Sequence, residues 1–133
     1  MKKLILFFAC ISMIASVSYA GGFYKAQITS LPTGSGVQKS GTFNIGETQN
    51  YTMWVSAYPH VYDSGSPWCA ADIQAYGKNN QFIADAFHQN TFQTGETQVS
   101  MGLVYVEYFK YSLSAEPDWR GGRTLYAVAE VYW

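Results

Sequence analysis

The sequence predicts an all-β fold, a small antiparallel β-sandwich of about seven strands. Apolar and polar residues alternate in several short stretches, which is the pattern of a strand that is buried on one face. Clusters of Gly, Pro, Asn and Ser separate these stretches, and such clusters are typical of chain reversals. No stretch shows the sustained period of 3.6 residues that an amphipathic helix would need.

The first three expected strands are residues 23–29, 41–45 and 49–58. Residues 32–36 (Pro-Thr-Gly-Ser-Gly) separate the first strand from the second. In the third strand the side chains point alternately to two faces, because the strand period is two. One face carries Trp54 and Tyr58. The opposite face suits a core, and its members are Tyr51, Met53, Val55 and Ala57.

The fourth and fifth expected strands are residues 68–76 and 82–87, with a turn at residues 77–80 (Gly-Lys-Asn-Asn). In the fourth strand a small apolar face opposes a polar face. The apolar face consists of Cys69, Ala71, Ile73 and Ala75. The polar face consists of Asp72, Gln74 and Tyr76.

The last two expected strands are residues 98–112 and 124–133. The sixth begins with Val99, Met101 and Leu103 on one face, and residues 105–111 are aromatic on both faces. In the last strand Tyr126 lies opposite the apolar face of Leu125, Ala127, Ala129 and Val131. Two packed antiparallel sheets are the simplest arrangement that buries so many apolar faces.

The order of these elements resembles a bacterial immunoglobulin-like sandwich. A Gly-Glu turn at 46–47 precedes the strand at 49–58, and the strand at 68–76 lies in mid-domain. A second Gly-Glu turn at 95–96 and the strand from Leu125 complete the pattern. The paired cysteines of antibody domains are absent. The resemblance implies architecture alone, because that fold hosts many unrelated functions.

The first 20 residues have the pattern of a cleavable signal peptide. A basic start at Lys2 and Lys3 precedes an apolar run over residues 4–17, and residues 18–20 (Ser-Tyr-Ala) supply the small residues of a cleavage site. The apolar run is short for a membrane span, which needs about 20 residues. We therefore expect residues 21–133 to form one domain that is secreted or periplasmic, and the start of the chain is typical of bacteria.

The charge balance argues against nucleic acid as a partner. The chain has 8 Lys and Arg against 9 Asp and Glu, with no basic run. Neither a pair of carboxylates placed for hydrolysis, nor a Gly-x-Ser-x-Gly motif, nor a phosphate-binding loop stands out in the sequence. We therefore expect a protein that is not an enzyme and that uses no cofactor.

Cys69 is the one cysteine beyond the expected signal peptide, and its place among apolar residues suggests that it packs in the core. Two alternatives stay open at this point. One is a disulfide to another chain, and the other is a nucleophile assisted by His60 or His88 with Asp63 or Asp72. The two histidines show no metal-ligand spacing, so no metal is expected.

Aromatic residues make up 17% of the chain and charged residues only 13%, which points to binding through an aromatic surface. Such a surface suits carbohydrate or an extracellular protein, so we expect a lectin-like or adhesive module. The predicted ligand-binding residues are Trp54, Tyr58, Asp72, Gln74, Tyr76 and Tyr126. Alternatively, these residues simply cover the sheet.

A second alternative is a membrane-active toxin subunit or an oligomeric β pore-former. It rests on the alternating strand at 125–133, which ends in Trp133 and has the pattern of a barrel strand. The sequence leaves the oligomeric state open.

Overall fold

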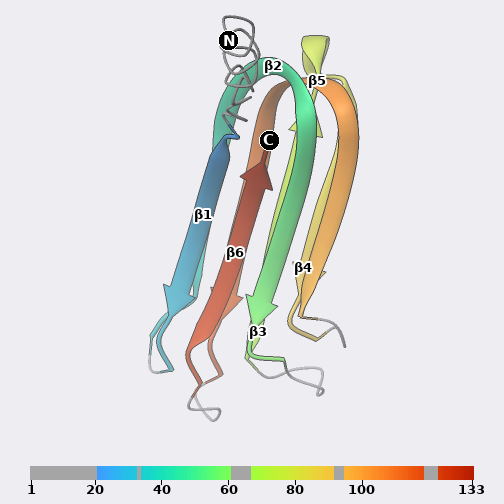
Figure 1. Ribbon diagram of the computed structural model, residues 1–133. Helices are drawn as coiled ribbons and strands as arrows, with labels where there is room; N and C mark the ends of the chain where they lie inside the picture. Colours follow the sequence, from blue (N-terminus) through green and yellow to red (C-terminus); the bar gives the residue numbers. More distant parts are fainter. Residues whose placement is uncertain (1–20, 33, 61–66, 92–94, 119–122) are drawn as a thin grey trace, which may run out of the picture.

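The computed structural model describes residues 21–32, 34–60, 67–91, 95–118 and 123–133, and it confirms the all-β sandwich (Figure 1). The strands are β1 (Phe23–Ser30), β2 (Val37–Tyr58), β3 (Trp68–Tyr76), β4 (Phe82–Gln89), β5 (Glu96–Glu116) and β6 (Leu125–Tyr132). The short 3-10 turn η1 (Lys78–Asn80) joins β3 to β4. The expected signal peptide lies outside the described residues. Within the described ranges, no helix combines the length and the apolarity needed to cross a bilayer.

The six strands form one antiparallel sheet in the order β1-β6-β2-β5-β3-β4. The strands β2 and β5, of 22 and 21 residues, bend together and fold the sheet onto itself (Figure 1). On one side of the bend, residues 47–56 of β2 pair with 96–106 of β5, and on the other side 37–44 pair with 108–115. The strands that we expected at 41–45 and 49–58 are therefore one continuous strand, so the chain has six strands instead of about seven.

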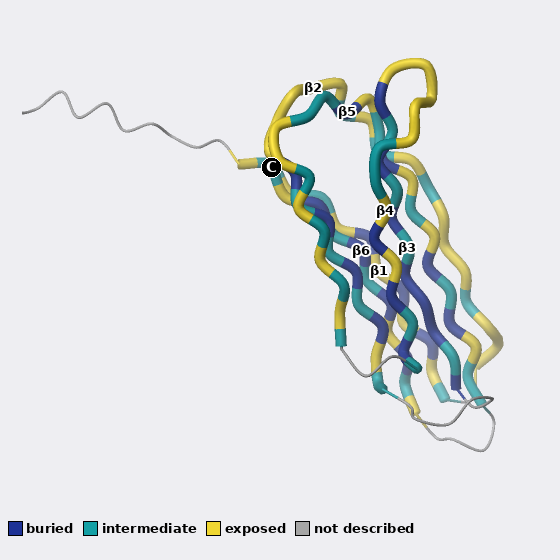
Figure 2. The backbone as a smooth tube through the Cα atoms, turned by 90° about the vertical axis from the view of Figure 1, so that its right-hand side faces the viewer, coloured by how far each residue is buried: buried dark blue, intermediate teal, exposed yellow. Residues whose placement is uncertain are grey.

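Bending creates two layers that pack face to face. The first layer contains β1, β6, the second half of β2 and the first half of β5. The second layer contains the first half of β2, the second half of β5, β3 and β4. Buried and exposed positions alternate along the strands (Figure 2). The core lies between the layers, with Met53 and Val55 from the first and Ile73 and Leu113 from the second.

Two glycines allow the long strands to bend. Gly46 and Gly102 have φ of +68° and +67°, a region that side chains with a Cβ rarely adopt. Gly46 lies at the register shift between Asn44 and Glu47, and Gly102 lies opposite Tyr51 at the second shift. The shift at Gly102 is a bulge that reverses the side-chain alternation of β5, because the inward positions change from Val99 and Met101 before it to Val104 and Val106 beyond it. This explains why Leu103, which we expected on the face of Met101, is 73% exposed.

The topology is that of a jelly roll. When the halves of β2 and β5 are counted separately, the chain has eight segments, which pair as first with eighth, second with seventh, third with sixth and fourth with fifth. This is a long hairpin rolled into a two-layered sandwich. An immunoglobulin domain instead pairs its first strand with its second. The resemblance seen in the sequence thus extends to the sandwich and not to the strand order.

Candidate functional site

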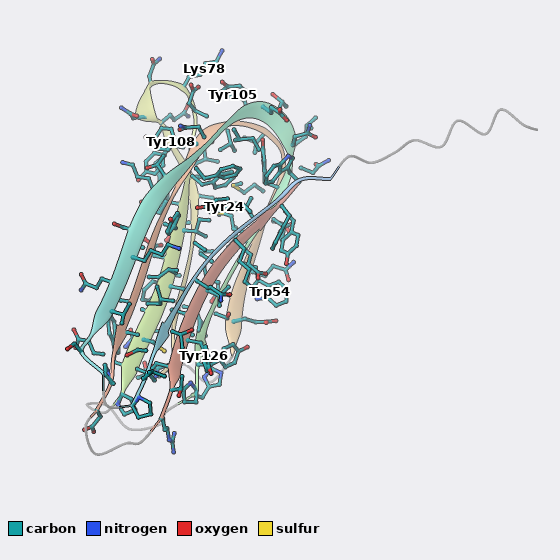
Figure 3. The ribbon with its side chains drawn as sticks, turned by 90° about the vertical axis from the view of Figure 1, so that its left-hand side faces the viewer. Tyr24, Trp54, Lys78, Tyr105, Tyr108 and Tyr126 are labelled. Carbon is teal, nitrogen blue, oxygen red and sulfur yellow. The ribbon has the colours of Figure 1, made fainter. Side chains whose placement is uncertain are left out.

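The six predicted ligand-binding residues divide between the two outer faces of the sandwich. Trp54 and Tyr58 on β2 and Tyr126 on β6 lie on the first layer. Asp72, Gln74 and Tyr76 on β3 lie on the second layer. Figure 3 labels Trp54 and Tyr126 on one side and Tyr108, the β5 neighbour of Tyr76, on the other. Because the core separates the two sets, they cannot contact the same small ligand.

The outer face of the second layer, which we call the second-layer face, is organised in rows that cross β2, β5, β3 and β4. The aromatic row consists of Asn44, Tyr108, Tyr76 and Phe82. The next row consists of Thr42, Lys110, Gln74 and Asp85. The third row consists of Ser40, Ser112, Asp72 and Phe87. Side chains from distant parts of the sequence thus become neighbours on one flat surface.

A hydrogen-bond relay runs along β3. The Tyr76 hydroxyl donates to Gln74 Oε1 at 2.7 Å, and Gln74 Nε2 donates to Asp72 Oδ2 at 3.0 Å. The three residues lie on the same face because they are spaced by two along a strand. The relay fixes the amide orientation of Gln74. Since the Tyr76 proton is already used, its oxygen and the Asp72 carboxylate face a ligand as hydrogen-bond acceptors.

The aromatic row is held in a defined geometry. The rings of Tyr76 and Tyr108 stack with centroids 5.1 Å apart and planes 16° apart, and Phe82 meets Tyr76 edge-on at 5.9 Å. The Tyr108 hydroxyl donates to Asn80 Oδ1 at 2.7 Å. Asn80 has φ of +58°, a conformation that asparagine tolerates better than most residues. The turn after β3 therefore fixes the Tyr108 ring before any ligand arrives.

Lys110 brings a positive charge to the aromatic row. Its Nζ lies 5.1 Å from the Tyr76 ring centroid and 5.7 Å from that of Tyr108, within the range of a cation–π contact. Among the described residues, Lys110 forms no ion pair with a carboxylate, and the ion pair that is found joins Lys25 and Glu130 on the first layer. Its three N–H donors are available to a ligand.

A hollow of about 330 Å³ lies beside the aromatic row. It spans β2, β5 and β3, and it forms where serine and threonine side chains leave space between longer ones. Most of its lining residues carry polar groups, and their aliphatic portions together with the Tyr111 ring supply apolar surface as well. The lining residues are Ser40, Gly41, Thr42, Asp72, Gln74, Lys110, Tyr111 and Ser112.

The surroundings of Asp72 raise the pKa of its carboxyl group. Burial is the main cause, and the negative charge of Asp85 adds to it. The hydrogen bond from Gln74 and a backbone bond from Ile73 oppose the shift only in part. Asp72 therefore takes up a proton at a higher pH than a free aspartate does.

The outer face of the first layer also carries exposed tyrosines beside polar side chains. Tyr58 and Tyr126 are paired across β2 and β6, and they are 38% and 47% exposed. Glu130 accepts a hydrogen bond from Tyr132 at 2.7 Å and pairs with Lys25 at 3.0 Å, so both of its oxygens are engaged. Trp54 Nε1 is buried and lacks a hydrogen-bond partner in the described structure, so it gives a ligand no polar contact.

Cys69 lies in the core, as its alternation predicted. The side chain is fully buried, its Sγ contacts the Tyr58 carbonyl oxygen at 3.4 Å, and burial raises the pKa of the thiol to about 12. A neutral, inaccessible thiol fits neither a nucleophile nor a disulfide to another chain. Asp63, the other suggested partner, lies outside the described residues. Over the described ranges, no three His, Cys, Asp or Glu side chains gather closely enough to hold a metal ion.

Sequence reasoning missed the residues that complete the second-layer face. Tyr108 and Lys110 come from β5, and Ser40 and Thr42 come from the first half of β2. The sequence offered one signal, the aromatic run at 105–111. It did not show which of these side chains would lie beside Tyr76, because that depends on strand register.

Fold and site together define a jelly-roll sandwich with a polar hollow beside a tyrosine stack on one layer. No family model matches the chain, and no curated protein matches it. A chain from the structure of infectious bursal disease virus strain Gt is similar with a TM-score of 0.38 and 14% identity, covering 85% of this chain and 32% of that one. For strain Gx the TM-score is 0.36 and the identity 10%, covering 84% and 31%. This chain thus spans about a third of those chains. Likeness at this level supports no conclusion about fold or function.

Proposed function

We propose that this protein is an exported, non-catalytic module that binds carbohydrate through the second-layer face. The observation that carries the proposal is a polar hollow beside two stacked tyrosines whose positions are already fixed. A sugar ring needs both features, because its C–H face packs on an aromatic ring while its hydroxyls require hydrogen-bond partners. The signal-peptide pattern of residues 1–20 is the reason for proposing export.

The chemistry of the hollow favours a sugar over a protein partner. Protein interfaces gain most of their affinity from aromatic or arginine anchors that fill water-free apolar pockets. Here the hollow instead offers the hydroxyls of Ser40, Thr42 and Ser112, the amide of Gln74 and the charge of Lys110. These groups would stay unpaired beneath an apolar anchor, which is costly, whereas a ligand rich in hydroxyls can satisfy them.

The position of the site on strands also suits specific binding. The lining residues belong to three neighbouring strands whose backbones are fixed by the ladder hydrogen bonds. Sites on regular elements hold their geometry better than sites on loops. Lectin domains are among the proteins that use the jelly roll, although the fold by itself does not decide the function.

A matched pair of variants tests the proposal. Tyr108→Ala removes one ring of the stack, whereas Tyr126→Ala removes an exposed tyrosine from the opposite face. We expect wild-type residues 21–133 to be retarded by at least one polysaccharide in affinity electrophoresis. Tyr108→Ala should weaken binding by about tenfold, equivalent to about 1.4 kcal/mol, because ring stacking is lost. Tyr126→Ala should bind like the wild type.

Two results would count against the proposal. One is the absence of retardation by any polysaccharide, and the other is an equal loss of binding in both variants. Leakage of dye from liposomes in the same preparation would support the pore-forming alternative instead.

The raised pKa of Asp72 predicts how binding depends on pH. The ionised carboxylate accepts hydrogen bonds from sugar hydroxyls, and protonation weakens it as an acceptor. Binding should therefore weaken as the pH falls, starting at a higher pH than the usual aspartate pKa of about 3.9 would give. Asp85→Asn removes a repelling charge and should move the midpoint to lower pH. Calorimetric titration of the ligand at a series of pH values measures the pH midpoint of binding. An unchanged midpoint in Asp85→Asn would contradict the role given to the Asp72 carboxylate.

A further inference from the structure

The second-layer face carries more negative than positive charge. Asp72 lines the hollow, and Asp85 of β4 lies opposite Gln74 of β3. The negative charges of Asp72 and Asp85 therefore repel one another. Lys110 is the cation of the same rows. Two other lysines lie on these segments. Lys39 is at a position of β2 whose side chains point away from the second-layer face. Lys78 Nζ lies 5.0 Å from the ring centroid of Tyr105. The three rows thus carry two carboxylates and one ammonium group.

The polar atoms of the site also favour ligands that donate hydrogen bonds over ligands that only accept them. Asp72 accepts hydrogen bonds only, and Tyr76 has already committed its proton to Gln74. A ligand over these two residues must therefore donate, as a sugar hydroxyl can. A carboxylate or sulfate group on a ligand also only accepts, so it could form no hydrogen bond with the Asp72 carboxylate or the Tyr76 oxygen, and it would add a third negative charge.

Lys110 does not reverse this preference. Its ammonium group lies over the rings of Tyr76 and Tyr108, and Lys110 also lines the hollow. There it can donate to a ring oxygen or a hydroxyl of a sugar that rests on Tyr108. An anion drawn to Lys110 would also approach Asp72, which is in the same hollow.

We infer that the second-layer face selects neutral glycans with adjacent free hydroxyls, and that it rejects glycans bearing carboxylate or sulfate groups. This inference rests on the proposed function and adds the chemical class of the ligand. Asp72 Oδ2 already accepts from Gln74 Nε2, but a carboxylate has further lone pairs, so its oxygens can still accept from two neighbouring hydroxyls of a pyranose ring. The hydroxyls of Ser40, Thr42 and Ser112 can donate or accept and so adapt to the remainder of the sugar.

The test compares neutral with acidic polysaccharides and then uses a matched pair, the native and the oxidised form of one polysaccharide. Residues 21–133 are titrated with three neutral polysaccharides that carry free primary hydroxyls (amylose, β-1,4-mannan and β-1,4-galactan) and three acidic ones (polygalacturonate, alginate and hyaluronate). The neutral polysaccharide that binds best is then oxidised at its primary hydroxyls to carboxylates, and the titration is repeated at low salt. We expect the neutral form to bind and the oxidised form to bind more than tenfold more weakly.

The variant Asp85→Asn provides the matched control. Asp85 is exposed and does not line the hollow, so the variant should fold, and its effect is read as the ratio of the affinities for the oxidised and the neutral form. Because it removes one repelling charge, it should recover part of the affinity for the oxidised form. If an acidic polysaccharide binds as tightly as the neutral ones, or if oxidation has no effect, the inference is wrong while the proposed function stands. If no polysaccharide binds at all, the proposed function fails and the inference fails with it.

Discussion

Replacing Asn90 by alanine is expected to lower the free energy of unfolding by about 2–5 kcal/mol, since each buried polar group left unpaired costs about 1–3 kcal/mol. Asn90 is fully buried directly after β4. Its Oδ1 accepts a hydrogen bond from the backbone N–H of Cys69 at 3.2 Å. Its Nδ2 donates to the carbonyl oxygens of Pro59 and Pro67 at 3.2 and 2.9 Å. One side chain thus joins the end of β2 to the start of β3.

Urea unfolding followed by tryptophan fluorescence measures this loss. Asn90→Asp is the informative control, because it keeps the acceptor for Cys69 but loses the donors to the two proline carbonyls. We expect a loss of stability in Asn90→Asp as well. Wild-type stability in both variants would show that Asn90 does not hold these strands together.

Replacing Phe109 by alanine is expected to cost about 3–5 kcal/mol of stability, as is usual for a buried phenylalanine. Phe109 is fully buried on β5 between the two residues that form the binding face, Tyr108 and Lys110. Its ring meets Tyr51 edge-on at 5.4 Å and lies 6.2 Å from Phe43. The rings of Phe109, Tyr51 and Phe43 thus pack on the inner side of the layer whose outer side carries the Tyr76–Tyr108 stack.

Phe109→Leu keeps most of the apolar volume and should destabilise the protein much less. Thermal unfolding of both variants measures the difference. We expect Phe109→Leu to fold and to bind the polysaccharide that the wild type binds. A stable Phe109→Ala variant would contradict the place given to this ring in the core.

The alternation of side chains predicted the core faces well, because the period of two is a local property of the chain. The face of Tyr51, Met53 and Val55 is buried as expected. The face predicted for Leu103 was wrong because the bulge at Gly102 reverses the side-chain alternation of β5. The positive φ of Gly102 that goes with this bulge cannot be read from the residue pattern. The long bent strand β2 was read as two strands for a related reason. The Gly-Glu pair at 46–47 has the sequence of a turn, yet the pairing with β5 continues beyond it.

The candidate site could be predicted only in part. Asp72, Gln74 and Tyr76 were found together because they lie on one strand, where spacing alone determines the shared face. Trp54 and Tyr126 were assigned to the same surface, but the roll of the sheet places them on the opposite layer. Register between distant strands decides which residues complete the site, and it depends on pairing over the whole chain.

The measurement that tests the central claim most directly is amide chemical-shift mapping of ¹⁵N-labelled residues 21–133 titrated with a neutral oligosaccharide. We predict saturable shifts on the second-layer face, at Thr42, Asp72, Gln74, Lys110 and Ser112, with little change around Trp54, Tyr58 and Tyr126. Shifts confined to the first layer would contradict the assignment of the binding site to the second-layer face.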